Sequence, residues 1–559
     1  MHPYDILIIS IYLIFTISLS IYVSKESSSS IDSYFLSRRS SSWWLLGTSM
    51  VATTLSIDTP LVIIGWIYTA GTWKNWFWWS FLFTHCLIIF YFSKYWKRIG
   101  VLTDNELIDY RYSGNASRIL KLFKAFYFSV FFNLIISAWI ISAFIKIFTV
   151  IIGDNTFILL LISTLTAMFY TTLGGIRGVM INDFIQYFIA FAGSIILAFF
   201  IINSDQIGGF GNYFEIVKSL PSDKTSFIPN IFNYDDFLTF IAYITVVWWT
   251  SHNADGGGYI IQRLCSAKTE RDGALGTVWF ILNHYVLRLM PWLFIGFASL
   301  VIFQTSTISD SEKIFPIMIK NYLTPGFKGL ILIALISAYM STISTQVNWG
   351  SSYIVNDICK YFLKVKSEKK LVTIGRIFSV VFLTIALIIG LSIDNIGRVW
   401  IFLWSVSSGL GFFLLARWFY WRINAWSEIV SIVTSIFITL IFFFLDYVGV
   451  LEATFFKKLL IIPISILMGL LATFYTKPTD LDQLKDFYFK VKPDGNWSIF
   501  EKKETLLSFK NIGNSFLFSF GIILMIYSII NISLGMFYIA TIYGLIGIGI
   551  VLYLIKIKL

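Results

Sequence analysis

A hydroxyl-rich stripe interrupts an apolar stretch near residue 340. The sequence reads AYMSTISTQVN from Ala338 to Asn348. A lone Ser or Thr in a membrane helix usually bonds a carbonyl one turn back, but neighbouring Ser341 and Thr342 can converge on one cavity. Because a small hard cation prefers oxygen ligands, the stripe predicts one wall of a cation site.

A second polar feature lies in the middle of the apolar run 43–70, where Asp58 stands two residues before Pro60. Proline removes a backbone donor and clashes with the preceding turn, and an acid at mid-membrane is costly unless it has a function. We expect a half-helix ending near Leu55, an unwound stretch, and a second half-helix with Thr59 as its cap and Pro60 as its first residue. The bare carbonyls of such a break are further ligands for a cation.

The elements that position these groups are membrane spans. The chain is 57% hydrophobic and 13% charged, against about 45–50% and about 25% in soluble domains, which excludes an ordinary soluble enzyme. The formal net charge of +11 resides in short loops between apolar runs, so it indicates orientation in a membrane rather than nucleic-acid binding. No cysteine pair with disulfide or zinc spacing is present.

About fifteen stretches are long and apolar enough to span a bilayer. They lie near 4–23, 43–70, 75–95, 124–149, 156–173, 179–202, 236–258, 274–303, 328–357, 371–392, 397–416, 425–447, 459–476, 511–532 and 535–555. Lys and Arg concentrate in the odd-numbered connections, which predicts an integral protein of the plasma (inner) membrane with its N-terminus outside and its C-terminus cytoplasmic.

A second break is expected at the end of the run 236–258, where Gly256, Gly257 and Gly258 are consecutive. The two broken spans are five apart, so they occupy matching positions in two units of opposite orientation. Such a pair is typical of the central site of a secondary transporter. The alternative is two kinked helices in an unrelated bundle.

Four short motifs resemble, in order, the sodium:solute symporter family over roughly residues 4–425. They are SYFLSRR with WW at 33–44, LGGIRGV at 173–179 with Asp183 and Gln186, YIIQR at 259–263, and MST at 340–342 with Asn348 and NDI at 356–358. The resemblance implies an all-α polytopic membrane protein of the LeuT type, with five-plus-five inverted repeats, one extra helix ahead and about four behind.

This fold implies five units along the chain. They are an extra N-terminal helix with a cytoplasmic loop (1–42), the first repeat (43–202), an extracellular loop (203–235), the second repeat (236–424), and extra C-terminal helices with a cytoplasmic linker at 477–510 (425–559).

The resemblance also implies a sodium site, whose ligands fall on the carbonyls of Ala52, Leu55 and Ala338 and the hydroxyls of Ser341 and Thr342. Asp183 matches an aspartate thought to assist sodium on the cytoplasmic side. The alternative for Asp183 is an acid favoured by the dipole at a helix start.

The solute site departs from sugar-transporting relatives, which carry an amide, an acid and a base where this chain has Thr54, Trp78 and His284. A sugar is therefore disfavoured without being excluded. The other candidates are Asp58, Thr59, Trp248, Trp249, His252, Asn253 and Asp255.

Each of the main candidates has a structural alternative. Asp58 could hold a solute amine or hydroxyl, or act as a local cap or as the partner of Arg288. Trp248 and Trp249 could wall the site or serve in packing, and we expect Arg288 to pair with an acid or to snorkel.

These features predict a symporter, not an enzyme, in which inward sodium flow drives import of a small organic solute by alternating access. The solute is a sugar, an amino acid or a related metabolite, and the expected partners are Na⁺, the solute and the lipid bilayer. Two alternatives stay open: a proton-coupled carrier using Asp58 or His284, and a transporter-like membrane sensor. No nucleotide-binding or hydrolase motif supports ATP-driven or enzymatic chemistry.

Overall fold

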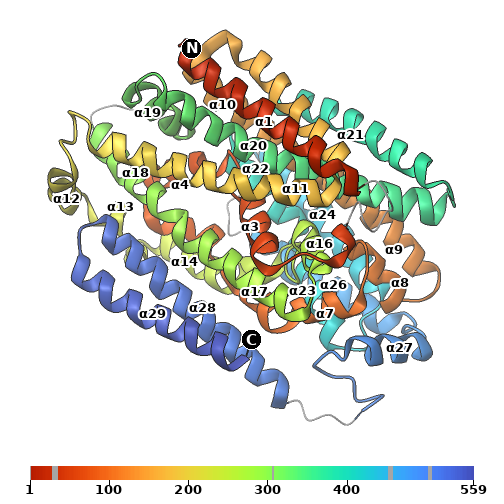
Figure 1. Cartoon of the computed structure of the whole chain (residues 1–559). Coiled ribbons are helices and arrows are strands. Elements are labelled where there is room, and N and C mark those ends of the chain that lie inside the picture. Colours follow the sequence, from red (N-terminus) through yellow and green to blue (C-terminus); the bar gives the residue numbers. More distant parts are fainter. Residues whose placement is uncertain (1, 28–35, 305–307, 451–457, 502–505, 559) are drawn as a thin grey trace.

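The chain forms a bundle of helices in a computed structural model (Figure 1). The structure describes residues 2–27, 36–304, 308–450, 458–501 and 506–558. Residues 33–35 of the first family motif lie outside these ranges. Within them, β-structure is limited to two isolated bridges, Ser41 with Ala267 and Tyr420 with Asn496.

The helices of the N-terminal half follow one another with short connections. They are α1 (Pro3–Ser27), α3 (Trp43–Thr54), α4 (Thr59–Thr69), α5 (Trp76–Trp79), α6 (Leu82–Leu87), α7 (Ser93–Ile99), α8 (Leu107–Arg111), α9 (Gly114–Phe126), α10 (Asn133–Ile152), α11 (Thr156–Ile202), α12 (Phe210–Lys218) and α13 (Ser222–Thr225). Two π-helical segments, Ile88–Phe92 and Tyr127–Phe132, join α6 to α7 and α9 to α10.

The remaining helices continue the same pattern. They are α14 (Tyr234–Ala242), α15 (Trp248–Thr250), α16 (Gly258–Ser266), α17 (Glu270–Ile281), α18 (Leu289–Ile302), α19 (Ile314–Tyr322), α20 (Phe327–Ser352), α21 (Glu368–Gly390), α22 (Ile396–Ser407), α23 (Leu410–Phe419), α24 (Ala425–Tyr447), α26 (Ile461–Tyr475), α27 (Leu481–Val491), α28 (Leu506–Ser533) and α29 (Phe537–Lys558). Further π-helical segments are Tyr243–Val247, Leu282–Leu287 and Tyr353–Phe362.

Helix occupies every predicted span. By length and apolar composition, 10 helical stretches among the described residues could cross a membrane, or up to 12 if each of two bent pairs is one span, and α26 is shorter. The number fifteen therefore stays a prediction, while the all-helical architecture is confirmed.

The predicted break in the first long span is present. Helices α3 and α4 are bent by 56°, and Leu55 leaves the helical region with φ −83° and ψ +58°. The start of α4 at Thr59, with Asp58 as its cap residue, is one residue earlier than expected. A continuous helix would drive the Pro60 ring against the Ser56 carbonyl, so the chain unwinds there.

The second predicted break separates α15 from α16. Gly256 and Gly257 have φ of +134° and +74°, values that side chains rarely adopt. A Cβ on Gly258 would lie 1.9 Å from the Trp349 ring of α20, so the turn also lets the two backbones approach closely.

Two further interruptions are present, of which the one between α22 and α23 was not predicted. Helices α22 and α23 are bent by 48°, where a Cβ on Gly409 would meet the Ser431 carbonyl at 2.9 Å. Helix α11 bends at Gly175, whose φ is +54°, and this bend lies between the predicted spans 156–173 and 179–202. Gly409 stands within an apolar run and gave a weaker signal than Pro60 or three consecutive glycines.

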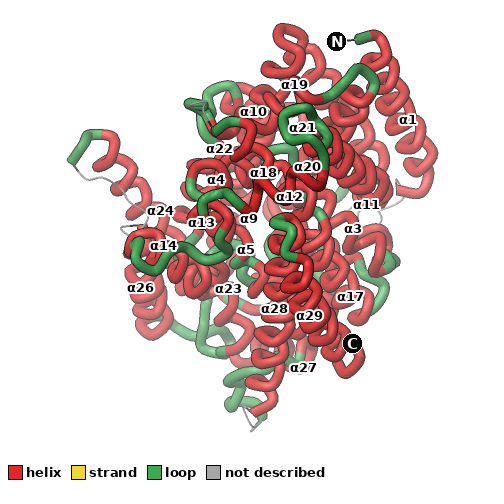
Figure 2. The backbone as a smooth tube through the Cα atoms, turned by 90° about the vertical axis from the view of Figure 1, so that its left-hand side faces the viewer, coloured by secondary structure: helices red, strands yellow, loops and turns green. Residues whose placement is uncertain are grey.

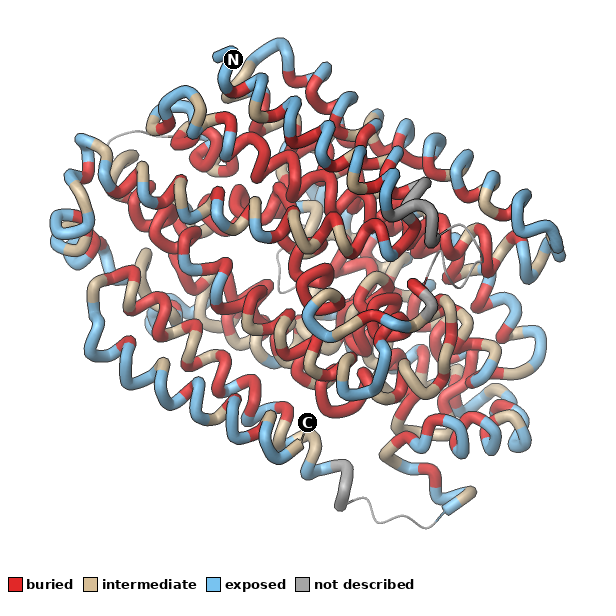
Figure 3. The backbone as a smooth tube through the Cα atoms, in the orientation of Figure 1, coloured by how far each residue is buried: buried red, intermediate tan, exposed pale blue. Residues whose placement is uncertain are grey.

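The broken helices lie inside the bundle. Helix α3 packs against α11, α17 and α20, while α1 packs on α11 and α20. The pair α28 and α29 lies at the periphery, on the side opposite α1 (Figure 1), and its outward face is exposed whereas the central helices are buried (Figure 3). In the rotated view, α24 and α26 also lie at the edge (Figure 2).

Loops that are predicted to share a side of the membrane pack together. Gln483 of α27 donates to the carbonyls of Asp109 and Tyr112 at 2.7 and 2.6 Å, joining the connections after the third and thirteenth spans. On the opposite side, Lys146 contacts Glu312 at 2.7 Å. These contacts between connections support the prediction that successive connections alternate between the two sides of the membrane.

Candidate functional site

The end of α3 meets the hydroxyl stripe of α20. Thr342 Oγ1 donates to the Thr53 carbonyl at 3.1 Å and to the Ala338 carbonyl at 3.0 Å. Ala52, Leu55, Ala338, Ser341 and Thr342 are all at most 5% exposed. The break and the stripe, predicted separately, therefore adjoin each other in the bundle.

The break frees a main-chain oxygen at this junction. The Thr59 N–H donates to the Ser56 carbonyl at 3.1 Å, so it does not close the turn on Leu55 as it would in a continuous helix. A cavity of about 30 Å³ is lined by Leu55 and Ala338, and a single water needs about 10–15 Å³. The carbonyls at the break, together with the Ser341 and Thr342 hydroxyls one turn along α20 from Ala338, are a donor set that suits Na⁺.

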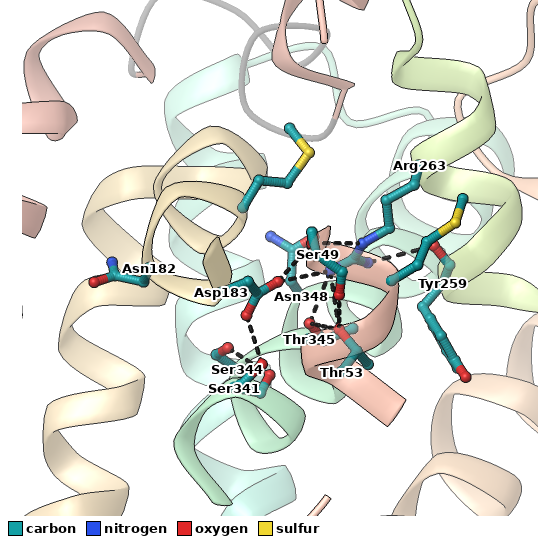
Figure 4. Close-up of polar contacts among 12 residues, drawn as sticks. Ser49, Thr53, Asn182, Asp183, Tyr259, Arg263, Ser341, Ser344, Thr345 and Asn348 are labelled. Atoms are coloured by element: carbon teal, nitrogen blue, oxygen red, sulfur yellow. Dashed lines mark hydrogen bonds and ion pairs between the residues drawn. The ribbon is translucent and has the colours of Figure 1, made fainter. Parts of the chain in front are cut away.

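Asp183 of α11 organises a buried polar centre beside this junction (Figure 4). Its carboxylate accepts hydrogen bonds of 2.6 Å from Ser341 and 2.6 Å from Ser49, and it pairs with Arg263 at 3.4 Å. The Arg263 guanidinium also donates to Thr345 Oγ1 at 2.9 Å. Asp183 is thus a tertiary ligand of α3, α16 and α20 and does more than cap its own helix.

This centre fixes the direction of the Ser341 hydroxyl. A hydroxyl has one hydrogen and two lone pairs, and Ser341 gives its hydrogen to Asp183. Thr342 likewise gives its hydrogen to carbonyls. Both oxygens therefore keep lone pairs that could ligate a cation.

A larger cavity of about 240 Å³ lies next to the break. Its walls come from the α3–α4 break, α5, α6, α10, the turn after α15, α17–α18, α20 and α22. The sequence candidates among its lining residues are Thr54, Asp58, Thr59, Trp78, His252, Asn253 and His284.

Trp248 and Trp249 do not line this cavity, which corrects the expectation that they wall the solute site. Their indole N–H groups donate to the carbonyls of Ile244 and Thr245 on their own helix. The Trp248 ring packs against Phe83 and Phe516. The Trp248 indole thus serves in packing, and the Trp249 indole lies outside the cavity lining.

Asp58 adopts neither of the structural roles considered for it. As cap residue of α4 it makes no side-chain cap bond, and it forms no ion pair with Arg288. Its Oδ2 accepts a hydrogen bond from Trp400 at 3.1 Å, while its buried Oδ1 has no hydrogen-bond partner among the residues that the structure describes. Because Asp58 lines the cavity, it has acceptor capacity for a bound molecule.

His284 and Thr54 are already committed to protein partners. His284 Nδ1 lies 2.9 Å from Thr54 Oγ1, and its Nε2 lies 3.2 Å from an Arg288 terminal nitrogen. Because Arg can only donate, Nε2 must accept, which assigns the ring proton to Nδ1. His284 therefore holds Arg288 in place instead of offering a free nitrogen to solute.

Several aromatic and polar lining residues were missed by the sequence reading. They include Phe77, Phe81, His85, Trp139, Tyr259, Tyr285, Gln346, Trp400 and Trp404. Trp400 and Trp404 are one helical turn apart, which places them on one helix face. This spacing is as typical of packing between helices as of a cavity wall, so it did not identify them as lining residues. Gln346 was visible as the amide that ends the hydroxyl stripe.

Asp255, another sequence candidate, belongs to a separate ion-pair cluster outside the cavity. It accepts hydrogen bonds from Arg417 at 2.6 Å and from Trp418 at 2.9 Å. Arg417 also contacts Glu428 of α24 at 3.5 Å, and Glu428 in turn pairs with Lys124. This buried cluster ties the α15–α16 turn to α23, α24 and α9.

A bundle with two broken helices beside a cavity that contains a few buried polar groups has the architecture of a secondary transporter. The sequence model of the sodium:solute symporter family matches residues 34–425. The chain belongs to this family. It is an integral membrane protein and a sodium-coupled solute symporter rather than an enzyme.

Similar proteins agree with this assignment. The chain is 24% identical over 460 residues to the sodium/glucose cotransporter of Vibrio parahaemolyticus, covering 77% of this chain and 83% of the relative. It is 26% identical over 344 residues to the osmoregulated proline transporter OpuE of Bacillus subtilis (strain 168), covering 60% of this chain and 66% of that protein.

A solved structure supports the fold independently. It is the substrate-bound outward-open state of a Na⁺-coupled sialic acid symporter, which matches with a TM-score of 0.66 at 20% identity and covers 86% of this chain and 99% of that one. The similarity confirms the LeuT-type architecture.

Proposed function

We propose that Na⁺ binds between the α3–α4 break and α20, held by the carbonyls of Ala52, Leu55 and Ala338 and the hydroxyls of Ser341 and Thr342. The support is geometric: the Thr342 hydroxyl bridges the Thr53 and Ala338 carbonyls at 3.1 and 3.0 Å. The donors are neutral, so they can strip the hydration shell of a monovalent ion without trapping it through a fixed charge.

Asp183 has a positioning role in this proposal. Its carboxylate accepts a hydrogen bond from the Ser341 hydroxyl at 2.6 Å. The lone pairs of Ser341 then point away from Asp183 and are available to a cation. Arg263 balances the Asp183 charge at 3.4 Å. Asp183 thereby orders the sodium ligands without contributing a net charge to the junction.

The solute site is the cavity of about 240 Å³, where Thr54, Asp58, Thr59, Trp78, Asn253 and His284 are among the lining residues. One observation carries the coupling argument: the short segment from Ala52 to Thr59 supplies both the sodium carbonyls and part of the cavity wall. Sodium that orders this segment also orders the solute site, so each ligand raises the affinity for the other.

The orientation and domain plan follow from the same reading. The N-terminus lies outside, the C-terminus is cytoplasmic, and residues 43–202 and 236–424 are the two inverted repeats, in the plasma (inner) membrane. Import then uses the sodium gradient, to which the membrane potential adds about 2.3 kcal/mol per charge per 100 mV. The named relatives act on glucose, proline and sialic acid, so sugars, amino acids and related metabolites form the candidate set.

The experiment is uptake into proteoliposomes from this candidate set under an inward Na⁺ gradient, a K⁺ gradient of equal size, or a pH gradient without sodium. We expect the solute to accumulate under the Na⁺ gradient and not under the K⁺ or pH gradient. Accumulation driven by the pH gradient in sodium-free buffer would support the proton-coupled alternative, and solute binding without accumulation would support the sensor alternative.

A further inference from the structure

Arg288 is a buried guanidinium in the wall of the cavity without a carboxylate partner. The sequence predicted that Arg288 pairs with an acid or snorkels to the membrane surface. The residue is only 1% exposed, so it does not snorkel. Its guanidinium donates hydrogen bonds to the His284 carbonyl at 3.0 Å, to His284 Nε2 at 3.2 Å and to Thr54 Oγ1 at 3.5 Å. No acidic residue in the described part of the chain forms an ion pair with it.

The remaining surroundings of Arg288 are aromatic. The guanidinium lies 5.9 Å from the centre of the Trp78 ring and 5.2 Å from that of Trp292. Cation–π contacts stabilise such a group only in part, and a buried unpaired charge is costly. Within a membrane span, this arrangement indicates a functional charge whose partner is a bound molecule and not a protein side chain.

The geometry leaves donors for that partner. A guanidinium carries five N–H groups. The three hydrogen bonds of Arg288 use the N–H of Nε and one N–H of each terminal nitrogen. One N–H on each terminal nitrogen therefore has no acceptor in the described part of the chain. A carboxylate can accept hydrogen bonds from both terminal nitrogens at once and also neutralises the positive charge. A sugar hydroxyl or an amide is uncharged and cannot neutralise it.

The same cavity contains the complementary charge. Asp58 is the one carboxylate among the described lining residues, and Arg288 is the one lysine or arginine. Asp58 is 2% exposed, and no described residue donates a hydrogen bond to its Oδ1. A neutral solute would leave both charges buried and unpaired once the cavity closes.

We propose that the transported solute is a zwitterion, with a carboxylate bound by Arg288 and a protonated amine bound by Asp58. The body of the solute then packs against the aromatic walls, to which Phe77, Trp139 and Trp404 contribute. This inference rests on the proposed function, because it assumes that the cavity is the solute site.

The test is a sodium-dependent binding screen on the purified full-length protein, read as thermal stabilisation in Na⁺ against K⁺. The probes are the common amino acids, short monocarboxylates, primary amines and monosaccharides. We expect the strongest sodium-dependent response from an amino acid. The amide of that compound, which lacks the carboxylate charge, and its N-acetyl form, which lacks the amine charge, should each bind at least about 30-fold more weakly.

Two charge-removing variants locate the contacts. Arg288→Gln should weaken binding of the amino acid at least about 30-fold but leave the affinity for its amide unchanged, and Asp58→Asn should do the same with the N-acetyl form. Arg288→Lys keeps the charge and should recover part of the affinity. Arg98→Gln, which removes a partly exposed ion pair with Glu270, is the matched control and should bind like the unmodified protein.

A larger response from a monosaccharide than from any amino acid would overturn the proposal, as would the absence of any amino-acid response. Equal affinity of Arg288→Gln and the unmodified protein for the amino acid would overturn it too. These results leave sodium-coupled symport intact, whereas sodium-independent accumulation in proteoliposomes would remove the proposed function itself.

Discussion

Replacing Thr342 tests the sodium site, because its hydroxyl joins α20 to the broken end of α3. Thr342→Val keeps the shape of the side chain and removes one of the five proposed ligands. A hydrogen-bond-type contact to a charged group is worth about 1.5–3 kcal/mol, and each 1.4 kcal/mol is a factor of about ten. The sodium concentration for half-maximal response should therefore rise about 10- to 140-fold.

The assay is the thermal stability of the purified protein during a Na⁺ titration, with K⁺ replacing Na⁺ at constant ionic strength. Thr342→Ser keeps the hydroxyl and should titrate like the unmodified chain. Ser352→Ala is a control on the same helix, because the Ser352 hydroxyl bonds only the Trp349 carbonyl at 2.7 Å. The reasoning is refuted if Thr342→Val, still folded, shows the same sodium dependence as Thr342→Ser.

Three further predictions concern packing and charge. Gly47→Ala should lower stability by about 1–3 kcal/mol, because its Cβ would lie 2.4 Å from the Gly276 carbonyl oxygen; Gly549→Ala, with open space around it, should melt like the unmodified protein. Arg417→Met breaks a buried cluster and should cost about 3–5 kcal/mol, so a melting temperature equal to that of the unmodified protein contradicts the cluster's role. Trp248→Leu should leave solute affinity unchanged, since this ring lies outside the cavity, and a large loss of binding would place it back in the site.

Sequence reasoning predicted the elements whose interruption has a strong local cause. Pro60 and the three glycines ending at Gly258 leave the backbone few alternatives, and both breaks are present. The division between the spans 156–173 and 179–202 also matches the bend at Gly175. The bend at Gly409 depends on close approach to other helices. A lone glycine in an apolar run does not reveal such a contact.

The polar centre was predictable where one helix carried the signal. The hydroxyl stripe of α20 indicated the sodium wall, and the family resemblance added Asp183. The role of Arg288 could not be read from the sequence, because whether an arginine meets an acid depends on which helices adjoin it. The same limit applies to Trp248, whose helix face is set by the position of Phe516 far along the chain.

The most direct test of the account is the reciprocity of sodium and solute binding in one purified preparation. The factor by which saturating sodium tightens the solute should equal the factor by which saturating solute tightens sodium. We expect both factors to be well above one, and both to fall towards one when Ser341→Ala and Thr342→Val are combined. Equal solute affinity in Na⁺ and K⁺, or full coupling in that double variant, would contradict a sodium site at the broken helix.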